Sequence, residues 1–219
     1  MSIQTFSAKN FRAICDQLAV ADKDLRHIIH IYGYPPMWTR PNTFETLVHI
    51  ILEQQVSLAS ALAALKKLQE KTKGITARKI LALSDDELRA CYVSRQKTLY
   101  LKALATALVK KKLDLEVLTS LPDEEIRVRL TAIKGIGNWT TDVYLMFVLQ
   151  RTDIFPIGDL AAVNALKRIK KLTPERASQE AMLRIINRWK PNRSVAAMIL
   201  WHFYLSAPKR KTNLAPVAE

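Results

Sequence analysis

The sequence has little glycine, five residues in 219, and little of the alternation between β-branched and polar residues that is typical of strands. Alanine and leucine are abundant instead. Both residues stabilise helices, and without a two-residue period no extended sheet is expected. These absences argue against a strand-rich fold and predict an all-α protein.

Cysteine is scarce too, and the two present, Cys15 and Cys91, lie in helix-like apolar contexts. We expect them to be buried thiols in a protein of a reducing compartment. A protein-bound iron–sulfur cluster needs about four such ligands, so none is expected here. The histidines show no zinc-binding spacing, and we expect no cofactor; they are His27, His30, His49 and His202.

Long apolar runs are missing as well. No stretch approaches the roughly 18 apolar residues of a membrane span. The start, MSIQTFSAKNF, has the features of neither a signal peptide nor a transit peptide. We therefore expect no membrane partner, and a location in the cytoplasm (nucleoid) of a bacterium or in the nucleus of a eukaryote.

Acidic residues are outnumbered, with 20 Asp and Glu against 34 Lys and Arg and a formal net charge of +14. A polyanion such as nucleic acid is the simplest partner for this excess, because phosphate contacts release counterions and give affinity for any sequence. Composition alone leaves open a basic surface without a binding role.

Apolar residues recur at helical spacing through most of the chain. A Pro- and aromatic-rich loop interrupts the pattern at Ile31–Pro41, and Ser84–Glu87 has the form of a capping box. The helical segments are expected at 11–30, 43–57, 57–72, 75–83, from 84, 94–112, from 122 to 150 in two helices, 159–172, from 173, and 193–205.

Two of these helices are joined at Lys134-Gly135-Ile136-Gly137. Two glycines allow a sharp turn and a close approach of the backbone to a ligand. The free N–H groups at the start of the next helix suit a phosphate, with Lys134, Thr140 and Thr141 nearby. Taken alone, the segment is also compatible with an ordinary helix–helix turn.

Twenty-two residues after Gly137, Asp159 follows a Pro-Ile-Gly turn and directly precedes an apolar-periodic helix. Aspartate is among the best N-cap residues. Without further context, Asp159 is therefore predicted to cap that helix.

The run IKGIGNWTTDVYLMFVLQRTDIFPIGDLA resembles the hairpin and Gly/Pro-Asp signature of the helix–hairpin–helix DNA glycosylase superfamily, and more narrowly its 3-methyladenine DNA glycosylase II (AlkA-type) members. Further similar segments are 44–61, 92–105 and 189–201, so the resemblance covers about 42–201. It implies a two-lobed helical bundle without the N-terminal β-domain of some relatives. The expected unit is 1–206, with a hairpin lobe at about 42–150, a second lobe from about 9–41 plus 159–206, and a basic, disordered tail at 207–219.

The resemblance implies a monofunctional, monomeric enzyme of base excision repair. It would bind double-stranded DNA with a damaged base, flip the nucleotide out, and hydrolyse the N-glycosidic bond of 3-methyladenine or 7-methylguanine with Asp159 as the catalytic carboxylate. Strand-cleaving relatives have a Schiff-base lysine where this chain has Trp139, so lyase activity is not expected.

Other roles implied by the resemblance are a wedge at Gln55, which would fill the gap left by the extruded nucleotide, and a monovalent cation held by hairpin carbonyls. Glycosylases for hypoxanthine or uracil, and a noncatalytic DNA-binding protein with the same hairpin, stay open as alternatives. The expected base-pocket residues are Trp139, Trp201, Tyr144 and Trp38; the expected DNA-backbone contacts are Lys134, Gly135, Gly137, Thr140, Ser57, Arg193 and Ser194.

Overall fold

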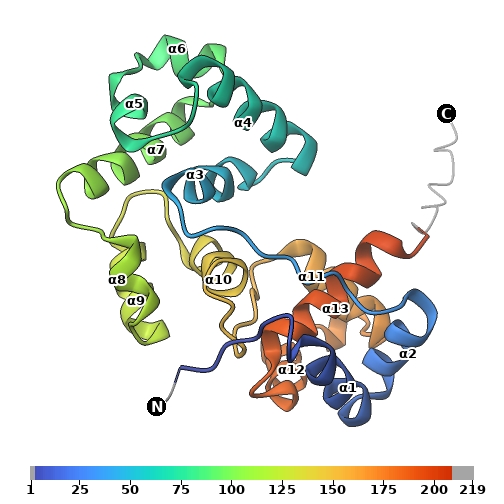
Figure 1. Cartoon of the computed structure of the whole chain (residues 1–219). Helices are drawn as coiled ribbons and strands as arrows, with labels where there is room; N and C mark the ends of the chain where they lie inside the picture. Colours follow the sequence, from blue (N-terminus) through green and yellow to red (C-terminus); the bar gives the residue numbers. More distant parts are fainter. Residues whose placement is uncertain (1–2, 209–219) are drawn as a thin grey trace, which may run out of the picture.

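The structure is a computed structural model that describes residues 3–208, and this part of the chain is helical, without a named strand (Figure 1). An isolated bridge between Thr5 and Arg151 is the one β-type pairing among these residues. The all-α prediction is confirmed. The helices are α1 Phe11–Ala21, α2 Lys23–Tyr32, α3 Phe44–Glu53, α4 Leu58–Thr72, α5 Ala77–Ala82, α6 Asp85–Ala90, α7 Arg95–Val109, α8 Leu115–Thr119, α9 Asp123–Thr131, α10 Asn138–Phe147, α11 Leu160–Ile169, η1 Pro174–Arg176, α12 Gln179–Ile186, η2 Asn187–Trp189 and α13 Arg193–Ser206.

Most of these helices begin at a side chain that accepts a hydrogen bond from the first turn, which satisfies N–H groups that have no partner inside the helix. At the start of α6, Ser84 and Glu87 form the predicted capping box in both directions. The capping residues are Asp22, Thr43, Ser57, Thr76, Ser84, Ser94, Asp114, Asp159 and Ser178.

The helix expected at 11–30 is two helices, which corrects the sequence prediction. Asp22 has an extended backbone, and its carboxylate accepts hydrogen bonds from the N–H groups of Asp24 and Leu25. This cap starts α2 directly after α1 ends. The two helices pack on each other, so each has apolar residues at helical spacing. The apolar pattern therefore continues across the break and does not reveal it.

The helix expected from Thr173 is also different. A short 3₁₀ turn, Pro174–Arg176, comes first, and α12 begins only at Gln179, where the Ser178 hydroxyl accepts the N–H of Ala181. Two competing start signals lie five residues apart, and the second one initiates the α-helix.

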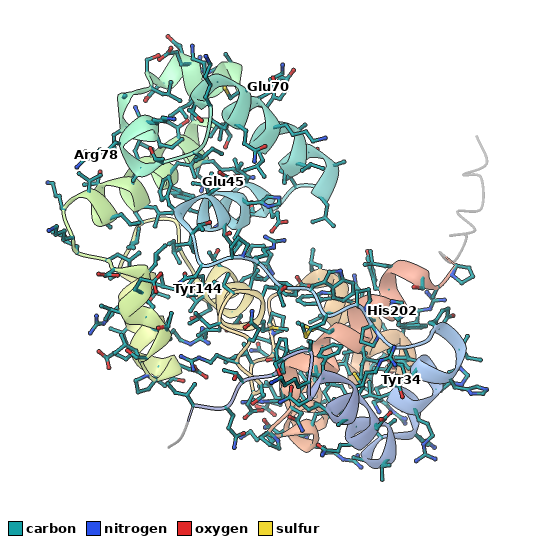
Figure 2. All side chains as sticks on the ribbon, viewed as in Figure 1. Tyr34, Glu45, Glu70, Arg78, Tyr144 and His202 are labelled. Atoms are coloured by element: carbon teal, nitrogen blue, oxygen red, sulfur yellow. The ribbon has the colours of Figure 1, made fainter. Side chains whose placement is uncertain are left out.

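The helices pack in two groups (Figure 1). In one group α3 packs on α4 and α7, while α5 and α6 also pack on α7. In the other, α13 packs on α1, α2 and α11. Helix α10 lies against α3 and α9, and its Tyr144 lies in the interior while Glu70 and Arg78 lie at the outer surface (Figure 2). Buried apolar side chains of both groups form one continuous core.

Both cysteines are buried free thiols, as predicted. At the end of α13, Ala207 is buried and the carbonyl of Pro208 accepts a hydrogen bond from Arg168 on α11. The prediction of a disordered tail falls on 209–219, outside the described residues. Among the described residues, no helix has the length and apolar content needed to cross a membrane.

Candidate active site

The hairpin between α9 and α10 has the sharp turn that its glycines predicted. Gly135 has a φ of +92°, in the left-handed region, and a Cβ placed on it would lie 2.0 Å from Cγ of Tyr100. Both the backbone conformation and the close approach of the ring therefore require glycine. Ile136 is buried beside it, while Lys134 and Gly137 are exposed.

Gly137 is the N-cap of α10, and no side chain caps this helix. The first-turn N–H groups of Asn138, Trp139 and Thr140 therefore have no acceptor within the helix. Together with the helix dipole, they form a surface with partial positive charge that suits an anion such as a phosphate.

The hairpin is tied to the end of α3 by Gln54. Its Nε2 donates to the carbonyl of Gly135 and to Oγ1 of Thr140, both at 2.9 Å. Thr140 is 1% exposed. The hydroxyl is buried and already bonded inside the protein, so it is not available to a DNA phosphate; a contact through the free N–H of Thr140 stays a prediction.

Asp159 caps α11, and its carboxylate also accepts hydrogen bonds from two tryptophans. Its Oδ1 accepts the N–H of Ala162 at 2.9 Å and Nε1 of Trp201 at 2.8 Å. Its Oδ2 accepts Nε1 of Trp139 at 3.0 Å. The carboxylate thus joins α11 to α10 and α13, and two indoles fix its orientation.

A carboxylate has about four lone-pair sites, and three of those on Asp159 are used by these donors. The remaining site is on Oδ2, and the residue is half-buried rather than enclosed. A fixed carboxylate of this kind stabilises positive charge that develops beside it, or orients a water molecule for attack.

Trp201 has a second neighbour that sequence reasoning missed. Phe147 stacks on it with ring centroids 5.0 Å apart and an interplanar angle of 23°. Spacing contained a signal for this residue, because Phe147 follows Trp139 by eight residues and so lies on the same face of α10, two turns further on.

Arg40 completes this side of the site, and no sequence signal pointed to it. Its guanidinium lies 5.7 Å from the centroid of the Phe147 ring and makes two hydrogen bonds of 2.8 and 2.9 Å to the carboxylate of Glu53. A continuous series of contacts thus runs from the last residue of α3 through Arg40, Phe147 and Trp201 to Asp159.

The pocket role predicted for Tyr144 is wrong. The residue is fully buried, and its hydroxyl donates to Oδ1 of Asn42 at 2.7 Å. Tyr144 follows Trp139 by five residues, which places it on a different face of α10. Trp38 lies half-buried in the segment between α2 and α3, and its pocket role stays a prediction.

Arg193 and Ser194 are engaged inside the protein. Arg193 pairs with Asp153 through Nε at 2.6 Å and Nη2 at 3.0 Å. Ser194 is fully buried and exchanges hydrogen bonds with the backbone of Ile154. Both side chains hold the segment that leads to Asp159. The buried Ser194 hydroxyl is not available to DNA, while the Arg193 side chain is 22% exposed and its phosphate contact stays a prediction.

The α3–α4 loop, Gln54–Ser57, contains two further predicted residues. Gln55 is exposed with a φ of +56°. Ser57 is exposed as well, and its hydroxyl accepts the N–H of Ser60 at the start of α4. The wedge role of Gln55 and the phosphate contact of Ser57 stay predictions.

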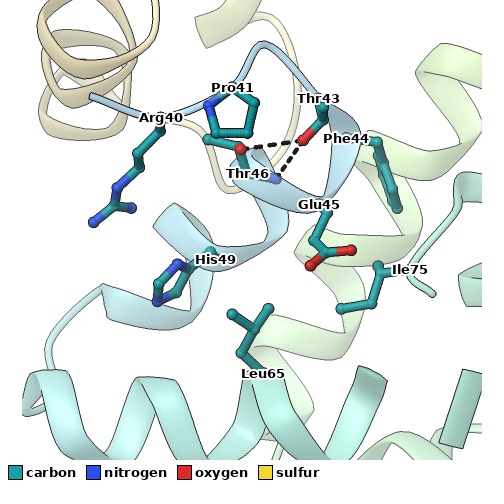
Figure 3. A pocket seen from close by; sticks show the side chains of 9 residues that line it. All are labelled: Arg40, Pro41, Thr43, Phe44, Glu45, Thr46, His49, Leu65 and Ile75. Carbon is teal, nitrogen blue, oxygen red and sulfur yellow. Dashed lines mark hydrogen bonds between the residues drawn. The ribbon is translucent and has the colours of Figure 1, made fainter. Parts of the chain in front are cut away.

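A hollow of about 650 Å³ lies beside the first half of α3 (Figure 3), and Asp159 is not among its lining residues. Its polar side chains are paired within the protein: Thr43 with Thr46, and Glu45 with Gln69. Arg40, at its rim, is paired with Glu53. These pairings leave the group around Asp159 as the candidate active site.

The cation expected at the hairpin carbonyls stays a prediction. The carbonyl of Gly135 accepts Gln54, and that of Ile133 accepts the N–H of Ile136. Within residues 3–208 no group of three or more His, Cys, Asp or Glu side chains could hold a metal.

The chain matches the model of the family described as HhH-GPD superfamily base excision DNA repair protein over residues 48–191. DNA-3-methyladenine glycosylase 1 of Schizosaccharomyces pombe is 29% identical over 191 residues, which cover 84% of this chain and 83% of that protein. A putative DNA-3-methyladenine glycosylase of Bacillus subtilis is 29% identical over 185 residues, covering 81% of this chain and 64% of that protein.

The chain is also similar to solved structures of 3-methyladenine glycosylases. The S. pombe 3-methyladenine DNA glycosylase in complex with abasic DNA has a TM-score of 0.80 at 27% identity and covers 89% of this chain and 98% of that one. The DNA-3-methyladenine glycosidase of Bacillus halodurans has a TM-score of 0.73 at 27% identity and covers 94% of both chains.

Proposed function

Since the chain belongs to the HhH-GPD superfamily of base excision DNA repair proteins, we propose that it is a DNA glycosylase that removes alkylated bases, 3-methyladenine and 7-methylguanine among them, from double-stranded DNA. The enzyme flips the damaged nucleotide out of the duplex, since a stacked base is unreachable. It then hydrolyses the N-glycosidic bond, and Asp159 is the catalytic carboxylate.

The observation that carries this proposal is the Asp159 carboxylate held between the indole N–H groups of Trp139 and Trp201. Cleavage of the glycosidic bond develops positive charge on the sugar, and a fixed anion beside the sugar carbon lowers the free energy of that transition state. The spare lone-pair site on Oδ2 faces this charge or holds the attacking water.

The substrate class follows from the chemistry of the leaving base. A purine alkylated at N3 or N7 already has a positive charge, so it leaves without a strong general acid. Aromatic faces attract such a cation, and Trp139, Trp201 and Phe147 supply them around the carboxylate. The relatives named as 3-methyladenine glycosylases support the same class.

We propose that the enzyme is monofunctional. A Schiff-base lyase needs a lysine amine as its nucleophile, and the position two residues after the second hairpin glycine is Trp139 in this chain. Its indole donates to Asp159 instead.

Excision of bases from methylated DNA, separated by chromatography, tests the proposal with wild type and Asp159→Asn. Asparagine caps helices as well as aspartate does, so the variant keeps the helix start and loses the charge. We expect wild type to release both methylated purines and the variant to be slower by at least about 100-fold, with duplex binding retained. Asp114→Asn, which changes an exposed N-cap on α8, is the matched control and keeps full activity.

Each contrary result has a distinct meaning. Full activity of Asp159→Asn would contradict the role of the carboxylate. Binding without release of any base by wild type would favour a noncatalytic protein. Release of hypoxanthine or uracil alone, in a panel of lesion duplexes, would assign a different substrate.

A further inference from the structure

We propose that Gln54 is a positioning residue that fixes the α3–α4 loop to the hairpin, so that the protein binds the DNA backbone and fills the gap in the duplex in one register. This inference rests on the proposed function. It also separates the roles of two adjacent glutamines, Gln54 and Gln55, which sequence alone does not distinguish.

The hydrogen bonds assign the two glutamines opposite roles. The amide of Gln54 points into the protein and donates to Gly135 and Thr140, so it is not free to enter DNA. Gln55 is exposed and has a left-handed backbone. The hydroxyl of Ser57, at the other end of the loop, bonds only to Ser60 of the helix that it caps. Gln54 is therefore the described loop side chain that is bonded to the hairpin.

The two acceptors lie on both sides of the hairpin turn. Gly135 precedes the N-cap Gly137, and Thr140 follows it in the first turn of α10. An amide nitrogen has two hydrogens, so one Gln54 side chain satisfies both acceptors and bridges the two sides of the hairpin turn. Neither methionine nor glutamate provides these two donors.

Helix α7 supports the same junction from a third direction. Lys97 donates from Nζ to the carbonyl of Leu52, near the C-terminal end of α3, at 2.6 Å. Tyr100, one turn further along α7, packs against Gly135. The end of α3, the start of α7 and the hairpin are thus joined by direct contacts, and Gln54 makes two of the hydrogen bonds among them.

The functional consequence concerns extrusion of the nucleotide. Unpairing and unstacking a base has a free-energy cost that gap-filling must offset. When the hairpin binds phosphates, Gln54 places the exposed Gln55 at a fixed distance from those phosphates. Loss of the two hydrogen bonds lets the loop move relative to the phosphates bound at the hairpin. Gap-filling by Gln55 is then weaker and extrusion of the nucleotide is less favourable, while bond cleavage at Asp159 is unaffected.

The test compares Gln54→Met, which keeps the length of the side chain and removes both donors, with wild type on two substrates. One has the alkylated base paired in a duplex, and the other has the same base unpaired in a bulge. We expect the variant to be slower by on the order of 10- to 100-fold on the paired base, the scale of a misplacement of about 1 Å, and much less affected on the bulged base. Equal losses on both substrates would overturn the proposal.

A matched control is Gln69→Met, which removes another half-buried amide that is bonded to Glu45 on α3, away from the hairpin. It should not distinguish the two substrates. Thermal unfolding of both variants identifies any general loss of stability, which would lower activity on both substrates alike.

A second readout does not depend on excision. A duplex with 2-aminopurine beside an abasic site reports unstacking by its fluorescence when the protein binds. We expect wild type and Gln54→Met to bind this duplex, with a clearly smaller fluorescence change for the variant. An identical change would overturn the role of Gln54, even if no methylated base is ever released and the proposed function itself has failed.

Discussion

Gly135 is a hairpin position at which any side chain is sterically unfavourable. Alanine there must adopt a left-handed backbone and must displace the Tyr100 ring. We expect Gly135→Ala to lower the free energy of unfolding by at least about 2 kcal/mol, from backbone strain and overpacking together. Urea unfolding measures the loss.

Gly137 offers the comparison for this experiment. It has a negative φ, and a Cβ on it would meet nothing within 4 Å. Gly137→Ala should therefore change the unfolding free energy by less than about 1 kcal/mol. Similar losses for the two alanine variants would contradict the steric argument.

Arg40 and Glu53 permit a second test at the scale of single residues. The side chain of Glu53 is 7% exposed and that of Arg40 is 25% exposed, so either alone leaves a partly buried charge without its partner. We expect Arg40→Gln and Glu53→Gln each to destabilise the protein, and the double variant to lose less than their sum, with a coupling of about 1 to 3 kcal/mol. Additive losses would show that the pair is not coupled.

Residue identity predicted the centre of the site but not its surroundings. The spacing of the hairpin and Asp159 placed both correctly as a turn and a helix start. The pocket role of Tyr144 was assigned wrongly, and the Thr140 hydroxyl is buried, because a residue type does not reveal which face of a helix is buried. Arg40 was missed because its contact with Phe147 joins segments far apart in sequence. Phe147 was missed although its spacing from Trp139 placed it on the same face of α10.

At the scale of elements, the carboxyl group at the start of α2 makes the stability of the protein depend on pH. Asp22 is largely buried, which by itself raises the pKa of its carboxyl group, but hydrogen bonds from Lys170 and Trp189 outweigh burial and hold that pKa below its usual value. A carboxyl group with a lowered folded-state pKa stabilises the protein above its unfolded-state pKa of about 4. This stabilisation is lost as the pH falls through the folded-state value.

We therefore expect Asp22→Asn, which keeps a capping side chain, to be less stable than wild type at pH 7. The difference should shrink as the pH falls below about 4. Urea unfolding of both proteins from pH 7 to 3 measures it, with Asp114→Asn as the control cap. A difference that stays constant with pH would show that the charge of Asp22 contributes nothing.

The same residue shows why element boundaries are harder to predict than elements. Apolar spacing correctly predicted helical structure along 11–30, since burial determines that spacing. The break depends on one carboxylate that accepts hydrogen bonds from two N–H groups and from Lys170, which directly follows α11 and is 148 positions away in the chain. Pairing across such a separation leaves no periodic signal.

The whole molecule has a formal net charge of +14, and its affinity for any duplex should depend on salt accordingly. Each phosphate contact contributes a slope of about −0.9 to the logarithm of the binding constant against the logarithm of salt concentration. We expect affinity for undamaged duplex to fall at least about tenfold between 50 and 200 mM salt. Fluorescence anisotropy measures this, and affinity independent of salt would contradict a backbone-binding surface.

At this scale, composition predicted the helical class and motif order predicted the family, both correctly. Composition and spacing alone did not predict how the two groups of helices meet. That arrangement depends on α10, α11 and α13 bringing two tryptophans to one carboxylate, and these contacts form only in the folded chain.

Burial of the two thiols affects how the protein reacts with electrophiles. Burial raises the pKa of Cys15 to about 12 and also raises that of Cys91. Thiolates are the nucleophiles that react with electrophiles, and at neutral pH neither residue forms much thiolate. Iodoacetamide should therefore label the native protein far more slowly than the urea-unfolded one. The reagents that methylate DNA also attack thiolates, so under the proposed function this burial would keep both thiols from reacting with the agents that create the substrate.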